Sequence, residues 1–148
     1  MRKLFLVGVA GIGLALATAP LRAHHAFSAE FDADKPLKLE GKVSKTEWVN
    51  PHAWIHIDVE KIDGKAATGE WMIEGGTPNT LMRRGVSRDT LKIGTPVVVT
   101  GYQAKDGSNR ANGRDITYPD GRKLFLGSTG TGAPYEQEGK DKDKDAPK

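Results

Sequence analysis

The sequence predicts a mainly β fold: a small five-stranded OB-like barrel with one short helix between strands 3 and 4. Two observations predict it. Apolar and polar residues alternate with a period of two, which is typical of half-buried strands. Asp-Gly turns separate the segments, and a short capped helix follows the third of them. An open sandwich of similar strands is the alternative architecture.

The first two strands are expected over 39–50 and 53–60. In the first, Leu39, Gly41 and Val43 share one side, but charged residues then fall on that side too, so the alternation is imperfect. The second alternates cleanly. Its apolar face carries Ala53, Ile55, Ile57 and Val59, and its other face carries Trp54, His56 and Asp58.

A hairpin turn at Asp63-Gly64 leads into a third strand over 69–75, because both turn residues tolerate positive φ. The short helix is expected over 77–85. Thr77 can cap its start, Pro78 suits its first position and Gly85 suits its end. So short a helix needs tertiary contacts, and we expect Leu81 and Met82 to supply them.

The fourth strand is expected over 95–104, and Asp106-Gly107 forms the next turn. A fifth strand is expected near 114–118, with a turn at Asp120-Gly121 and a continuation through 123–125. The barrel domain therefore covers 37–126. Residues 24–36 are expected to form an irregular arm with Phe27 and Phe31 as anchors, and the charged segment 127–148 is expected to be disordered.

Residues 1–23 have the three parts of a secretory signal peptide: a basic start, an apolar stretch and a short polar end. The apolar stretch is shorter than the roughly 20 residues of a spanning helix, although a retained membrane anchor is the alternative. Cleavage after Ala19 would leave Pro20 first, so we expect cleavage after Ala23. The mature protein would then begin at His24, be periplasmic or secreted, and keep no stable membrane anchor.

The charge of the mature chain argues against nucleic acid as a partner. Three of the 22 basic residues lie in the leader and none of the 19 acidic residues does, so the mature chain has no formal net charge. The chain also has no cysteine, which excludes disulfides and thiolate catalysis. We find no phosphate loop, nucleophile elbow or HExxH motif, and the expected protein is not an enzyme.

The four histidines are candidate metal ligands: His24, His25, His52 and His56. A terminal histidine can chelate one ion with its α-amino group and its ring, and a nitrogen-rich set of this kind favours copper. His52 and His56 would lie about 13 Å apart on a continuous strand, so the expected site is His24 with either His25 or one of His52 and His56. The alternative is that these histidines make ordinary structural hydrogen bonds, with His56 on a solvated face.

Trp48 and Trp54 are close in sequence and could form one aromatic surface. On an OB-like barrel such a surface could bind a saccharide or a protein partner. The other interpretation is that both rings close the core, because large aromatic residues dominate small cores.

Four segments resemble the exported bacterial family called domain of unknown function 6152: His24-His25-Ala26-Phe27, Glu47-Trp48-Val49-Asn50-Pro51-His52-Ala53-Trp54, Ala104-Lys105-Asp106-Gly107-Ser108 and Asp120-Gly121-Arg122-Lys123-Leu124-Phe125. The resemblance covers roughly residues 24–126. It implies export from a Gram-negative-type cell and a single small β domain. It carries no catalytic role, and it leaves the ligand, the partner and the oligomeric state open.

Overall fold

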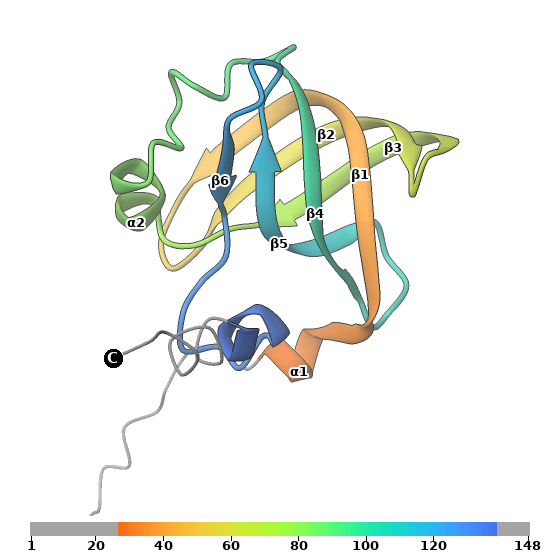
Figure 1. The fold of residues 1–148 in the computed structure, drawn as a ribbon, viewed down its shortest axis with the longest axis vertical. Coiled ribbons are helices and arrows are strands. Elements are labelled where there is room, and N and C mark those ends of the chain that lie inside the picture. Colours follow the sequence, from red (N-terminus) through yellow and green to blue (C-terminus); the bar gives the residue numbers. More distant parts are fainter. Residues whose placement is uncertain (1–26, 139–148) are drawn as a thin grey trace, which may run out of the picture.

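The structure, a computed structural model, describes residues 27–138, so the predicted leader and the candidates His24 and His25 lie outside the described residues. Six strands and two short helices follow one another along the chain (Figure 1): α1 (Phe27–Glu30), β1 (Phe31–Trp48), β2 (Ala53–Ile62), β3 (Lys65–Glu74), α2 (Pro78–Arg83), β4 (Pro96–Ala104), β5 (Arg110–Thr117) and β6 (Lys123–Phe125). A further helical turn covers 134–138.

The prediction of a mainly β fold is confirmed. The strands form one sheet in the order β3-β2-β1-β4-β5-β6, and each neighbouring pair is antiparallel. An additional parallel pairing joins β3 to β5 through Met72–Glu74 and Arg110–Asn112. The pairings therefore link β3, β2, β1, β4 and β5 in a closed cycle, with β6 as an extra strand on β5. The prediction of five strands is wrong because residues 123–125 pair as a strand of their own after the turn at Gly121.

The imperfect alternation of β1 has a local cause. Val43 pairs with Ile57 and Lys45 pairs with His56, so Ser44 is an extra residue without a partner in β2. A β-bulge of this kind shifts every following residue to the other face. Thr46 and Trp48 therefore turn toward the core side, opposite Ile55 and Ala53, while Lys45 and Glu47 turn outward.

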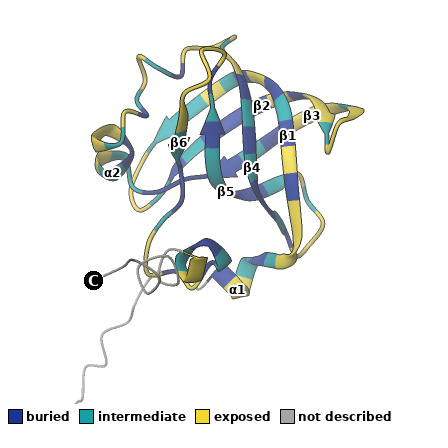
Figure 2. Cartoon of the chain, in the orientation of Figure 1, coloured by how far each residue is buried: buried dark blue, intermediate teal, exposed yellow. Residues whose placement is uncertain are grey.

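The main core lies inside the closed cycle of strands, and buried segments alternate with more exposed ones along β1, β2 and β4 (Figure 2). The apolar face predicted for β2 is confirmed, since Ala53, Ile55, Ile57 and Val59 are all buried. The other buried residues of this cluster come from β1, β3, β4 and β5, from the segment around α2, and from Tyr118 and Leu126 on either side of β6. Burial of these aliphatic side chains is the main favourable term in the stability of the fold.

α2 begins and ends as its sequence predicts. The Thr77 hydroxyl accepts a hydrogen bond from the Thr80 N–H, Pro78 occupies the first turn, and Gly85 follows the helix at φ 87°. Leu81 is fully buried against the core, but Met82 is exposed, so only one of the two predicted packing residues is confirmed. No helix among the described residues is long and apolar enough to cross a membrane.

A second hydrophobic cluster corrects the predictions for both ends of the domain. Phe27 and Phe31 are buried, as predicted, but residues 31–36 belong to β1 rather than to an irregular arm. The aromatic rings of Tyr102 and Tyr135 pack with them. Residues 127–138 of the tail predicted to be disordered are thus part of the fold. The buried side chains of Ala133 and Tyr135 anchor this segment. Its amino-acid composition did not indicate this anchoring.

Candidate functional site

His56 lies on the outer face of β2, where carboxylates from both neighbouring strands cover it. Its Nε2 is 2.8 Å from Glu47 Oε1 of β1, and its Nδ1 is 3.2 Å from Glu70 Oε1 of β3. The side chain is only 7 % exposed, so the expectation of a solvated His56 is wrong. Carboxylates only accept hydrogen bonds, so both contacts are satisfied only when the ring carries two N–H donors.

This arrangement stabilises the two carboxylates in their charged form. The pKa of Glu70 is lowered by its hydrogen bonds from His56 and then Ser44, and the pKa of Glu47 is lowered by those from Lys45 and then His56. Because the two carboxylates contact opposite edges of one ring, they do not converge on a common point. Each ring nitrogen of His56 contacts a carboxylate and the side chain is buried, so neither nitrogen is open to a metal ion.

His52 stands in a different environment at the start of β2. Its Nδ1 is 3.2 Å from the carbonyl oxygen of Gly75 and 3.7 Å from Glu74 Oε1. The carbonyl can only accept, so Nδ1 carries the proton and donates it. In the neutral ring Nε2 then keeps its lone pair, which is the state a metal-binding imidazole needs. The structure thus places the two histidines of the described chain in different hydrogen-bond environments.

Glu74 is a buried carboxylate that sequence reasoning missed. It is 9 % exposed, and burial raises its pKa, while the charge of His52 lowers it and that of Glu30 raises it further. Its nearest donor is the amide of Asn112 at 3.4 Å, and Asn112 in turn accepts a hydrogen bond of 3.0 Å from the Tyr135 hydroxyl. Glu74 pairs with Trp54 on the outer face of the sheet, so the strand pattern gave no sign that it would be covered.

Within residues 27–138, no group of three or more histidines and carboxylates is placed to hold a metal ion. A metal site that uses His52 therefore needs ligands from outside the described residues. The four predicted histidines therefore differ in their surroundings. Both ring nitrogens of His56 contact carboxylates, those of Glu47 and Glu70, whereas His52 has one ring nitrogen without such a contact. His24 and His25 lie outside the described part.

Trp48 and Trp54 are not brought together. The register pairs Trp48 with Ala53 on the core side and Trp54 with Glu47 on the outer side. Trp48 packs partly against the main core, donates a hydrogen bond of 2.9 Å to Thr46, and lies under the guanidinium of Arg88 at 5.7 Å. The bulge at Ser44 thus separates the two rings onto opposite faces, and a surface built from both is not assembled.

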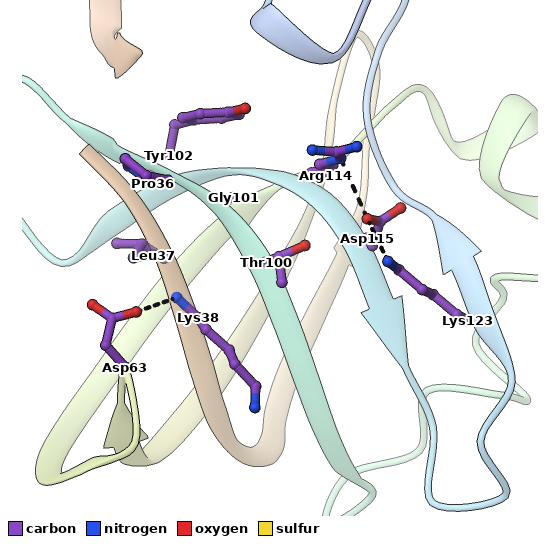
Figure 3. Close-up of a pocket in the computed structure, with 10 residues that line it drawn as sticks. All are labelled: Pro36, Leu37, Lys38, Asp63, Thr100, Gly101, Tyr102, Arg114, Asp115 and Lys123. Atoms are coloured by element: carbon purple, nitrogen blue, oxygen red, sulfur yellow. Dashed lines mark hydrogen bonds and ion pairs between the residues drawn. The ribbon is translucent and has the colours of Figure 1, made fainter. Parts of the chain in front are cut away.

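An open groove of about 440 Å³ lies over the outer faces of β1, β4 and β5 (Figure 3). Its charged side chains are paired with one another or with close neighbours. Asp115 lies 3.4 Å from Arg114 and 3.2 Å from Lys123, and Lys38 lies 3.1 Å from Glu40. The buried hydroxyl of Thr100 has no hydrogen-bond partner in the described part of the chain. With its cations neutralised, the groove offers little electrostatic attraction for an anionic ligand.

The comparison with known families agrees with the resemblance in the sequence. Residues 12–113 match the family of unknown function DUF6152, and the chain belongs to this family. The match includes all four histidines and ends within β5, ahead of the segment that carries Tyr135. No curated protein and no solved structure shows a significant match.

Proposed function

We propose that this chain is an exported, non-enzymatic domain, built as an OB-like barrel, that binds one Cu²⁺ ion through His24 and His52. The barrel assignment is supported by the closed cycle of strand pairings, by the parallel β3–β5 pair that completes it, and by the position of α2 between β3 and β4. The signal-peptide pattern of residues 1–23 supports export to the periplasm or beyond.

The observation that carries the copper proposal is the hydrogen bond from His52 Nδ1 to the Gly75 carbonyl. It orients the ring and leaves Nε2 as the coordinating nitrogen, in the way that backbone carbonyls orient metal-binding histidines generally. His56 has no equivalent nitrogen, because Glu47 and Glu70 occupy both.

Covalent geometry limits how far His24 can be from the described fold. The Phe27 N–H donates to the Thr131 carbonyl at 2.9 Å, which fixes that residue on the domain. His24 lies three positions before Phe27 in the sequence, and a fully extended chain of three residues spans only about 10 Å. Cleavage after Ala23 would then supply an α-amino nitrogen beside the His24 ring, with His25 as the neighbouring imidazole.

Isothermal titration of copper into the mature protein tests the proposal. A protein that begins at His24 should bind one Cu²⁺ more tightly than about 1 μM. His52→Ala should weaken binding at least about tenfold, because it removes a ligand. One glycine added ahead of His24 should change the affinity and the coordination, because the α-amino group moves away from the His24 ring and His25 becomes the third residue of the chain.

The control variant is His56→Gln, whose copper affinity should match that of the parent protein. Equal affinity in the glycine-extended protein, or binding that does not depend on His52, would overturn the proposal. A mature protein whose first residue is not His24, as determined by mass spectrometry of the secreted product, would overturn it as well.

A further inference from the structure

Three arginines at the end of α2 and just after it have no carboxylate partner among residues 27–138: Arg83, Arg84 and Arg88. Each of the other arginines in that range does form an ion pair, Arg110 with Asp106, Arg114 with Asp115 and Arg122 with Asp120. Between residues 75 and 95 the chain carries four basic residues and a single acidic one. The segment after β3 is therefore a local source of positive charge, although the mature chain has no formal net charge.

Arg84 is the most constrained of the three. Its Nη1 donates to the Gly127 carbonyl at 2.7 Å, and its guanidinium lies 4.7 Å from the centre of the Phe125 ring. Burial lowers the pKa of Arg84, so its surroundings in the protein favour the cation less than water does. The guanidinium nevertheless stays charged at neutral pH. A partly buried cation without an anion costs free energy, and a carboxylate bound from outside would offset that cost.

Arg88 is placed against a different aromatic ring. Its guanidinium lies over Trp48, at the end of β1, at 5.7 Å from the ring centre. Trp48 is only partly buried, and Met82, the neighbour of Arg83 on α2, is 49 % exposed. Figure 1 shows α2 and the segment after it along one side of the molecule, outside the strands. We call Trp48, Arg83, Arg84 and Arg88 the α2 arginine surface.

The separation of these cations indicates which kind of anion suits them. Arg84 and Arg88 lie on rings from β6 and β1, two strands that are not neighbours in the sheet. One phosphate or sulfate would suit one guanidinium, whereas a peptide with several carboxylates can pair with each of them in the bidentate geometry that arginine favours. Residues 139–148 of the chain itself hold four basic and three acidic residues, so they do not supply an acidic segment.

We propose that the α2 arginine surface binds an acidic segment of a partner protein, whose side-chain carboxylates pair with the three arginines. The partly exposed Trp48 and the exposed Met82 lie next to these cations and offer apolar contact to the same segment. This surface is independent of the proposed copper site, because none of its residues is a candidate ligand. Since local charge provides the attraction, added salt should weaken the binding.

Fluorescence anisotropy of a fluorescein-labelled decaglutamate peptide tests this surface in the mature protein. The peptide should bind with a Kd below about 100 μM at roughly 20 mM salt, and its affinity should fall at least about tenfold at roughly 200 mM salt. The double variant Arg83→Gln/Arg88→Gln should weaken binding at least about tenfold, because it removes two unpaired cations. Arg110→Gln/Arg122→Gln is the matched control. It removes the same charge from arginines that already have carboxylate partners, and its affinity should stay within about twofold of the parent value.

Amide chemical shifts of the protein locate the bound peptide independently of affinity. The signals of residues 82–88 and the indole N–H signal of Trp48 should move on titration, whereas those of Arg110 and Arg122 should not. A weaker Kd than expected in the parent protein, an unchanged Kd in Arg83→Gln/Arg88→Gln, or an equal loss in the control variant overturns the proposal. Binding to vesicles of phosphatidylglycerol without binding to the peptide also overturns it and assigns the surface to a membrane instead.

Discussion

At the scale of single residues, two histidines four positions apart differ in what their ring nitrogens contact. His56 is enclosed by Glu47 and Glu70, and both of its nitrogens are used in holding β1, β2 and β3 together on their outer face. His52 uses one nitrogen on a backbone carbonyl and retains the other. Hydrogen-bond partners, rather than residue type, therefore determine which of the two can bind a ligand.

The Glu70–His56 contact predicts a pH dependence of stability. The pKa of Glu70 is lowered below its ordinary value of 4.5 by hydrogen bonds from His56 and Ser44. A carboxyl group with a lowered folded-state pKa contributes stability above its unfolded pKa, and that contribution is lost as the pH falls through the folded value. Glu70→Gln should therefore have a lower Tm than the parent protein at about pH 7. As the pH falls below about pH 4.5, its Tm should decrease less than that of the parent protein.

Thermal unfolding between about pH 7 and pH 3 measures this effect. Glu60→Gln is the control, because Glu60 makes only an exposed ion pair with Lys42 at 3.0 Å. If Tm decreases with falling pH to the same extent in Glu70→Gln and in the parent protein, the contact does not contribute to stability.

At the scale of elements, β1 connects the two halves of the sheet. Its first half pairs with β4 at Phe31 and through Pro36–Lys42, and its later part pairs with β2 through Leu39–Trp48. Register shifts beside Gly41 and at Ser44 bend it between these partners. Gly41 lies where the backbone of β2 approaches most closely, since a Cβ there would be 2.2 Å from the Asp58 carbonyl oxygen.

Gly41→Ala should destabilise the domain by about 1–3 kcal/mol, because the added methyl group meets backbone that cannot move independently of the sheet. Lys42→Ala, at the exposed neighbouring position, should change stability by less than about 0.5 kcal/mol. Urea unfolding followed by tryptophan fluorescence measures both. A Gly41→Ala protein as stable as the parent would contradict the close approach of β1 and β2.

At the scale of the whole molecule, the chain closes on itself through the second hydrophobic cluster. The rings of one aromatic group come from both ends of the described chain and from β4: Phe27, Phe31, Tyr102 and Tyr135. Residues more than a hundred positions apart in the sequence are thus in contact. Tyr135 also donates a hydrogen bond to Asn112, whose amide lies 3.4 Å from Glu74. The stability of this end of the domain and the environment of His52 are consequently linked.

Tyr135→Ala should destabilise the domain by about 3 kcal/mol, because it removes a buried aromatic ring and leaves Asn112 without its hydroxyl partner. Gln137→Ala, an exposed position on the same helical turn, should have an effect below about 0.5 kcal/mol. Calorimetric unfolding distinguishes the two. Equal stabilities would show that the segment after β6 does not pack on the domain.

The sequence by itself determined the local structure of this protein. The alternation of β2, the Asp-Gly turns and the caps of α2 are each set by a few neighbouring residues, and each is present as predicted. The mainly β fold and the family membership follow from the same local patterns.

Only the tertiary structure determined which residues share a face of the sheet and that the two ends of the described chain are in contact. The bulge at Ser44 reversed the faces of Trp48 and Glu47, and it arises from pairing with β2 rather than from β1 alone. The packing of Tyr135, the burial of Glu74 and the different environments of His52 and His56 depend on partners 9 to 38 positions away. Contacts of that range leave no periodic signal in the chain, because their geometry exists only once the sheet has closed.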